Sequence, residues 1–175
     1  MLSLTKYYMK TKITSLTDAL TFLLEGLYYS ETKLVDEFPV WCDKITSPRL
    51  QDVVGGYFDS TQDKLLKLDR VFNYLMKDPE PRVNKVVDEF IAETHLMLSS
   101  SGSENLRDIL TIGCFQNLNA YKMISYRSAY LMAVELELDT ATDLLQQVLE
   151  WEVETSKVLA LLSIEEFNQS RKVNC

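Results

Sequence analysis

Glycine, proline and histidine are scarce in this chain of 175 residues, which has 5 glycines, 4 prolines and 1 histidine. The scarcity of glycine and proline, which form turns, excludes β-sandwiches and β-barrels, because these folds need a turn every several residues. No segment alternates polar and apolar residues over a useful length, so no sheet is expected. The sequence also lacks a phosphate-binding glycine loop and a G-x-S-x-G elbow. Nucleotide-binding and serine hydrolase classes therefore find no support.

Positive charge is in deficit, since 18 lysines and arginines stand against 26 aspartates and glutamates, for a formal net charge of -8. Nucleic-acid binding depends on cationic neutralisation of phosphates, so we expect no nucleic-acid partner. No apolar run is long enough for a signal peptide or a membrane span, and we expect no membrane partner. The 3 cysteines have no CxxC spacing, which favours reduced thiols and a cytoplasmic location.

Helical periodicity is what the sequence does contain. Apolar residues recur every three or four positions in five segments. They predict helices over about Ser15–Trp41, Pro48–Lys77, Arg82–Leu98, Ser103–Glu137 and Asp139–Phe167. Serines 15, 47 and 103 are the predicted N-caps. Four long helices and one short helix predict an all-α four-helix bundle with an extra helix in a crossover connection. We expect one bundle domain over residues 14–167, with a flexible tail at 1–13 and a frayed tail at 168–175.

Polar residues interrupt the apolar stripes near the middle of several helices. Glu31 falls in the stripe of the first helix and Glu152 in that of the last. In the fourth helix, Gln116, Asn119 and Lys122 also point inward. A buried carboxylate needs a cation, a proton or strong donors, so these positions form a candidate site. The alternative is that each glutamate lies at the edge of its stripe with its carboxylate in water.

A metal site in such a bundle uses about four carboxylates and two histidines. The single histidine, His95, lies off the apolar stripe of the short third helix, so we expect it to face solvent. The density of aromatic residues leaves open a third interpretation, an adaptor that binds an unknown protein partner through an aromatic surface. The residues concerned are Tyr28, Tyr29, Phe58, Phe115, Tyr126 and Tyr130, most of which we expect in the core or in a dimer interface.

Four strings, in order and with matching spacing, carry a resemblance that covers about residues 15–163. They are SLTDALTFLLEGLYYSETKLVDEFP, SPRLQDVVGGYFDSTQDKLLKLDRVF, EFIAETHLML and LLQQVLEWEVETSKVL. The sequence resembles the YciE/YciF family of ferritin-like bacterial proteins, which are often described as stress-induced. The resemblance implies a ferritin-like bundle that forms a homodimer and carries a carboxylate-rich metal site.

This sequence departs from the metal-site pattern of that family. Glu31 and Glu152 match two of its glutamates. The helix-two pattern H-x-x-E-T lands on YFDST, so tyrosine 57 and Ser60 replace a histidine and a glutamate. The helix-four pattern E-H-Y-E lands on NAYK, so Asn119 and Lys122 replace two glutamates. Five positions correspond to the metal site of the family, and we call them the remnant positions: Glu31, Ser60, Asn119, Lys122 and Glu152. If any metal binds, only Glu31 and Glu152 remain as its ligands.

Our prediction from the resemblance is a non-catalytic, structural or stress-associated protein without a cofactor. Lys122 is expected to supply the charge of a metal by pairing with Glu31, Glu152 or both, while Gln116, Asn119 and Ser60 are available to satisfy remaining lone pairs. The alternative is a carboxylate protein that binds iron or manganese and has oxidase or iron-handling activity.

Overall fold

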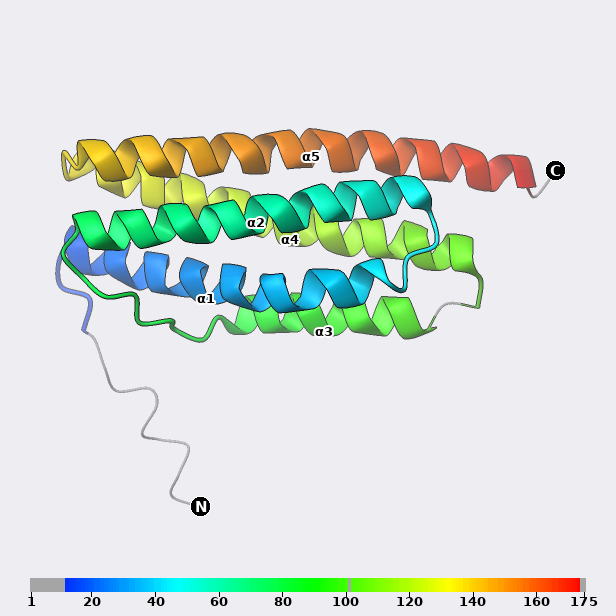
Figure 1. The fold of residues 1–175 in the computed structure, drawn as a ribbon, viewed down its shortest axis with the longest axis horizontal. Coiled ribbons are helices and arrows are strands. Elements are labelled where there is room, and N and C mark those ends of the chain that lie inside the picture. The colour runs from blue at the N-terminus through cyan, green and yellow to red at the C-terminus, as the bar shows by residue number, and fades with distance from the viewer. Residues whose placement is uncertain (1–11, 101, 174–175) are drawn as a thin grey trace, which may run out of the picture.

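The computed structural model of this chain describes residues 12–100 and 102–173 (Figure 1). These residues form no strand and five helices, α1 (Leu16–Cys42), α2 (Pro48–Tyr74), α3 (Lys85–Ser100), α4 (Glu104–Glu135) and α5 (Asp139–Val173). The four long helices lie side by side, and α3 lies along α1 and α4. The all-α bundle with a short third helix is confirmed. In the described ranges, no helix is long and apolar enough to cross a membrane.

The serines predicted as N-caps begin three of the helices. Ser15 accepts a hydrogen bond from the backbone N–H of Asp18, whose carboxylate accepts one from the backbone of Ser15, which completes a capping box. The side chains of Ser47 and Ser103 cap α2 and α4 in the same way, each through the N–H three residues on. Short polar residues before each apolar stripe therefore set where these helices begin.

The third helix begins at Lys85 and not at Arg82, because Arg82 is engaged elsewhere. Its backbone N–H donates to the carbonyl of Glu25 at 3.2 Å. Its guanidinium donates to the carbonyl of Phe22 at 3.2 Å and lies 3.6 Å from the centre of the Phe22 ring. These contacts hold the α2–α3 connection extended across α1, so the helix starts only after the connection has crossed.

The last helix is longer than predicted, since α5 continues beyond Phe167 to Val173. Residues 168–173 contain neither glycine nor proline, so nothing in their sequence ends a helix. Residues 1–11 and 174–175, which belong to the predicted tails, lie outside the described residues. The domain limits stay a prediction.

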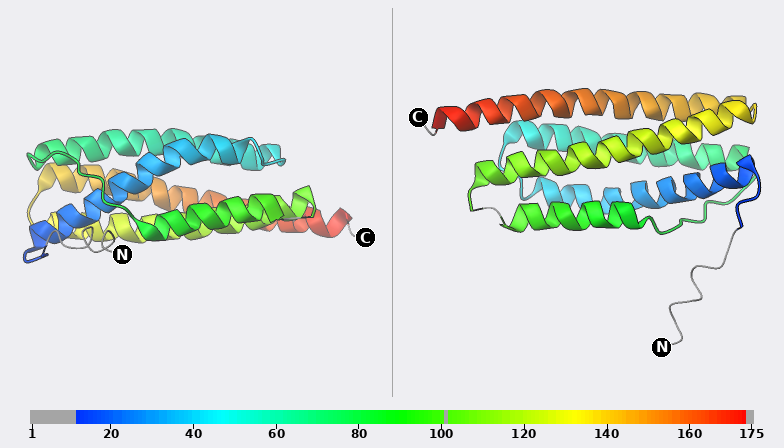
Figure 2. Two further views of the ribbon diagram at one scale, coloured as in Figure 1. Left: turned by 90° about the horizontal axis from the view of Figure 1, so that it is seen from below. Right: turned by 180° about the vertical axis from the view of Figure 1, so that it is seen from behind.

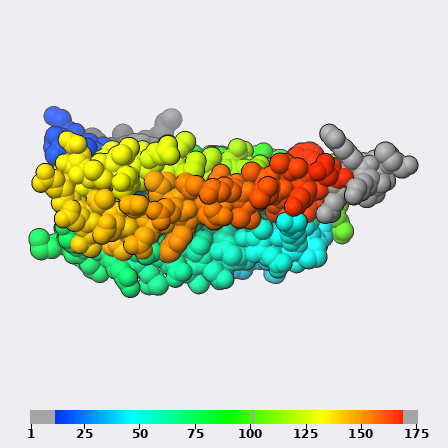
Figure 3. All heavy atoms as spheres, turned by 90° about the horizontal axis from the view of Figure 1, so that it is seen from above, coloured from blue at the N-terminus to red at the C-terminus, as the bar shows by residue number. Residues whose placement is uncertain are grey.

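The buried apolar side chains form two clusters along the bundle. One contains Leu34, Phe38, Trp41, Ile45, Leu50, Val54, Tyr57, Val87, Ile91, Leu98, Ile112, Phe115, Leu118, Leu159 and Leu162. The other contains Leu20, Leu24, Leu27, Leu68, Val71, Phe72, Tyr126, Ala129, Ala133, Ala141, Leu145 and Val148. In the view from above, α5 covers this side of the molecule, with α2 along one flank and α4 along the other (Figure 3). The helices thus enclose a core that is divided in two.

Candidate functional site

Buried polar residues mark the level at which the core divides. In α1, Glu31 lies between Leu27 of one apolar cluster and Leu34 of the other. Each of the other long helices repeats this pattern, with Lys64 in α2 between Tyr57 and Leu68, Lys122 in α4 between Leu118 and Tyr126, and Glu152 in α5 between Val148 and Leu159. All four charged side chains are fully buried. We call Glu31, Lys64, Lys122 and Glu152 the ionic layer.

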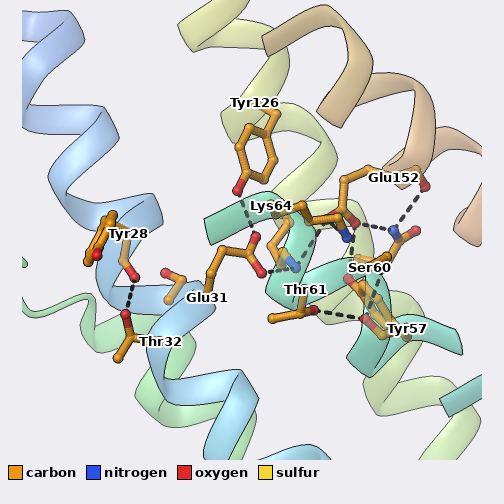
Figure 4. A network of polar contacts seen from close by, with 12 residues as sticks. Tyr28, Glu31, Thr32, Tyr57, Ser60, Thr61, Lys64, Tyr126 and Glu152 are labelled. Carbon is orange, nitrogen blue, oxygen red and sulfur yellow. Dashed lines mark hydrogen bonds and ion pairs between the residues drawn. The ribbon is translucent and has the colours of Figure 1, made fainter. Parts of the chain in front are cut away.

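Lys122 lies between the two carboxylates. Its Nζ donates a hydrogen bond to Oε2 of Glu31 at 2.8 Å and lies 3.0 Å from Oε1 of Glu152. The ammonium thus bridges α1 and α5 from a position on α4. Figure 4 shows Glu31 and Glu152 reaching toward one region from opposite sides. A cation at this point is in contact with both carboxylates.

Lys64 supplies a second buried ammonium. Its Nζ lies 2.7 Å from Oε1 of Glu152, in an ion pair that lacks the alignment of a hydrogen bond. The centre of the Tyr57 ring lies 4.6 Å from this Nζ and 4.7 Å from that of Lys122, so the ring faces both cations. The order of contacts is Glu31, Lys122, Glu152, Lys64. Two negative and two positive charges alternate and cancel.

Uncharged donors complete the coordination of both carboxylates. The hydroxyl of Tyr126 donates to Oε1 of Glu31 at 2.7 Å (Figure 4). The hydroxyl of Tyr57 donates to Oε2 of Glu152 at 3.0 Å, and Nδ2 of Asn119 donates to the same oxygen at 2.7 Å. Each of the four carboxylate oxygens therefore has a protein partner, which is the condition for burying these charges.

Charge and burial shift the pKa values of these groups in a consistent way. For Glu152, burial alone raises the pKa, but the ammonium groups of Lys122 and Lys64 outweigh it and hold the carboxyl well below its usual range. For Lys122, burial opposes the charge, yet the carboxylates of Glu152 and Glu31 raise its pKa. For Lys64, burial followed by repulsion from Lys122 lowers the pKa, so Lys64 is the less stabilised ammonium of the two.

The pKa values of the two tyrosines are raised well above the usual range, first by burial and then by the carboxylate beside each hydroxyl. Tyr57 and Tyr126 are therefore neutral hydrogen-bond donors at physiological pH. In this arrangement the site can hold charge in a fixed position, with both tyrosine hydroxyls donating to carboxylates.

Four of the five remnant positions come together in the structure. Glu31, Asn119, Lys122 and Glu152 are buried and in contact, so neither glutamate is a stripe-edge residue with its carboxylate in water. Ser60 lies outside this set, because its half-buried hydroxyl donates to the carbonyl of Tyr57.

Gln116 and His95 also lie apart from the ionic layer. The amide of Gln116 donates to the carbonyl of Leu159 at 3.4 Å. His95 is partly exposed, and its Nε2 lies 2.6 Å from Oε2 of Glu37. Among the described side chains, no group of three or more histidines, cysteines, aspartates or glutamates is placed to hold a metal ion.

Lys64 was missed by the sequence prediction. From the sequence, Leu65 is the apolar residue that continues the α2 stripe after Thr61. Lys64, however, follows Tyr57 by seven residues and Thr61 by three, which places it on the same face. In the structure Lys64 is buried and Leu65 only half-buried. A charge count was the available signal, because two buried carboxylates and one ammonium leave one negative charge unbalanced.

Comparison with known proteins agrees with this architecture. The profile of a domain family described as "Domain of unknown function (DUF892)" matches residues 15–171. Protein YciF of Escherichia coli K12 is 23% identical over 156 residues, covering 89% of this chain and 94% of that protein.

Two solved structures share the fold. The crystal structure of the E. coli stress protein YciF superposes with a TM-score of 0.86 at 21% identity and covers 89% of this chain and 99% of that one. YcfI of Rhodopseudomonas palustris, described as a putative structural protein, has a TM-score of 0.83 at 22% identity and covers 87% and 98%. This chain therefore belongs to the DUF892 family, the family of the YciE and YciF proteins.

Proposed function

We propose that this protein is a non-catalytic member of its family, structural or stress-associated, in which ammonium groups take the place of a metal. Lys122 supplies positive charge to Glu31 and Glu152, and Lys64 balances the remaining charge. The observation that carries the proposal is the position of Lys122 Nζ, 2.8 Å from Glu31 and 3.0 Å from Glu152. A metal bridging these carboxylates needs the space in which this ammonium lies.

The donor set supports the same conclusion. The ionic layer offers two carboxylates and no histidine or thiolate, whereas a di-metal bundle site uses about four carboxylates and two histidines. Both carboxylates are already neutralised by ammonium groups at contact distance. A divalent cation entering here would add two positive charges to a layer whose formal charges cancel. These residues do not fit a di-metal centre.

A structural role follows from where the ionic layer lies. Each of the four long helices contributes one charged side chain at the level where the apolar core divides. Sliding any helix by one turn, about 5.4 Å, would move its charged side chain out of this level and separate the ion pairs. The layer is thus suited to fix the register of the helices, a use attested for buried polar groups in other bundles.

Elemental analysis tests the absence of metal. The protein is purified without chelator, incubated in air with ferrous iron or with manganese, desalted and analysed. We expect no stoichiometric metal, because the lysines already neutralise both carboxylates. The Tm should also be the same with chelator and with added manganese, since only a ligand of the native state raises it. One or two metal ions per chain in folded protein would overturn the proposal.

The competing function is a carboxylate protein that binds iron or manganese and acts as an oxidase or in iron handling. One observation favours it, because Glu31 and Glu152 converge on a single point (Figure 4). Two carboxylates hold a divalent ion weakly, and both lysines would have to withdraw.

The adaptor interpretation has less support, because all six aromatic residues on which it rested are buried or half-buried.

The proposed role is that of a homodimer in the cytoplasm, without a cofactor and without a nucleic-acid or membrane partner. The family resemblance is the support for the dimer. The deficit of positive charge supports the absence of nucleic acid, since the chain has a formal net charge of -8. Cysteines without CxxC spacing support a reducing compartment. The self-association surface is argued from the structure below.

A further inference from the structure

The outer face of α4 carries almost no charge, with Arg127 as the one exposed charged residue between Leu106 and Val134. Its outward residues recur every three or four positions and form a single stripe along the helix. We call this the α4 stripe, and it consists of Leu106, Leu110, Gly113, Asn117, Ala120, Ile124, Arg127, Leu131 and Val134. Five of its members are large apolar side chains that are 44% to 61% exposed.

Charge is absent from the middle of α4 over a long stretch. Between Ile109 and Tyr126 the only charged residue is Lys122, and it is fully buried in the ionic layer. The end of α5 exposes apolar side chains too, at Val158, Leu161, Ile164 and Phe167. The outward residues of α2, and those of α5 up to Lys157, are by contrast mainly charged or amide-bearing. They include Asp52, Asp59, Gln62, Asp63 and Arg70 in α2, and Asp143, Gln146, Gln147, Glu150, Glu154 and Lys157 in α5.

No other described helix covers the α4 stripe. In the view from behind, α4 is the helix nearest the viewer, with α5 on one side of it and α1 and α3 on the other (Figure 2, right). Gly113 has no heavy atom within 4 Å of the place where a Cβ would lie, so the space outside it is open. Single exposed apolar side chains are normal, but a row of five with one charge among them, uncharged over about 27 Å from Leu106 to Ile124, marks an association surface.

We infer that the α4 stripe is the surface through which two copies of this chain associate, antiparallel and about a two-fold axis. This inference rests on the dimer of the proposed function and adds the face and the register. It places the α4 helices of the two copies side by side with the axis between Asn117 and Ala120. The same patch is then used by both copies, as in an isologous interface.

The sequence of the stripe fits this register. Ile124 of each copy lies opposite Gly113 of the other, so a 61% exposed side chain faces the open space over a glycine. Leu106 lies opposite Leu131. Near the axis, Asn117 and Ala120 face each other, and their small size permits close approach of the two helices, whose axes in such packing are 8–10 Å apart.

Electrostatics favours a second copy over a charged partner. Each copy is acidic, with a formal net charge of -8, so self-association needs a face from which carboxylates are absent. The α4 stripe is such a face, and its single charge, Arg127, lies opposite Leu110 at this register. A basic or acidic partner finds no opposite charges in the middle of α4, and interface cores are depleted of charge.

Sedimentation equilibrium of Ile124→Glu tests the surface. We expect the wild-type protein to be a dimer and the variant to have a dimer Kd at least about 100-fold higher, because two carboxylates would be buried without partners. Leu66→Glu is the matched control, since Leu66 is 58% exposed on α2, away from the stripe. Its Kd should be unchanged. Circular dichroism checks that both variants are folded.

Crosslinking tests the register independently of affinity. Ala120→Cys is made in a variant in which cysteines 42, 114 and 175 are replaced, and is treated with a short bismaleimide. A covalent dimer is expected for Ala120→Cys and not for Leu66→Cys. A wild-type monomer, an Ile124→Glu dimer as tight as wild type, or crosslinking equal at both positions would overturn the inference. The metal analysis does not depend on these outcomes. A wrong interface can therefore be distinguished from a failure of the proposal that ammonium groups take the place of a metal.

Discussion

Replacing Lys122 with alanine is expected to destabilise the protein by about 3–5 kcal/mol, the range for a buried ion pair that loses one partner. The substitution removes the ammonium that contacts both Glu31 and Glu152, and it leaves two buried carboxylates with Lys64 alone. The free energy of unfolding in urea at neutral pH, with helix content followed by circular dichroism, measures the effect.

Two controls separate the loss of charge from other effects. Lys157→Ala removes a lysine that pairs with Glu154 while both are about two-thirds exposed, and it should change stability by less than about 0.5 kcal/mol. Lys122→Met keeps most of the side-chain volume, so a large remaining loss in this variant is due to charge and not to a cavity. A loss under about 1 kcal/mol for Lys122→Ala would mean that the ammonium is not needed to bury the carboxylates.

Glu152→Gln is expected to reduce stability at neutral pH by an amount that shrinks as the solution becomes acidic. Burial raises the pKa of Glu152, but Lys122 and Lys64 together lower it from 4.5 to about 2. A carboxyl whose pKa is lowered in the folded state stabilises the protein at pH values above the pKa that it has in the unfolded chain. That contribution is lost as the pH falls from about 4.5 toward about 2. The wild-type advantage should be on the order of 3 kcal/mol above pH 5.

The measurement for Glu152→Gln is the difference in unfolding free energy between wild type and variant at a series of pH values. Glu154→Gln serves as the control, because Glu154 is in the same helix but 66% exposed. Its difference from wild type should stay small and nearly constant with pH. A Glu152→Gln difference that does not change between pH 5 and pH 3 would show that Glu152 is not held ionised by the lysines.

Most of the fold could be predicted from the sequence because its signals are local. Apolar residues at spacings of three and four identified all five helices, and serines before the stripes gave three N-caps that the structure contains. The beginning of α3 was predicted three residues too early, because Asn84 caps the helix through the N–H of Val87 and tertiary contacts hold Arg82. Nothing in the residues around Arg82 indicates that its guanidinium bonds to the carbonyl of Phe22 on α1.

The site was predictable where a polar residue interrupts a long apolar stripe. Glu31, Lys122 and Glu152 stand out in this way, and the structure brings them together. Lys64 did not stand out, because Leu65 beside it follows Thr61 by four residues and precedes Leu68 by three, so it fits the same stripe. The roles of Tyr57 and Tyr126 were not predictable either, since a buried hydroxyl needs a hydrogen-bond partner but its position in the sequence does not show which group that partner is.

A double-mutant cycle on Glu31 and Lys122 tests most directly whether an ammonium holds these carboxylates in the place of a metal. Stabilities are measured for wild type, Glu31→Gln, Lys122→Met and the double variant. Because each single change leaves a buried partner uncompensated and the double change removes both charges, we predict a coupling of about 2–3 kcal/mol. A coupling below about 0.5 kcal/mol would mean that the two residues act independently, and it would contradict the account.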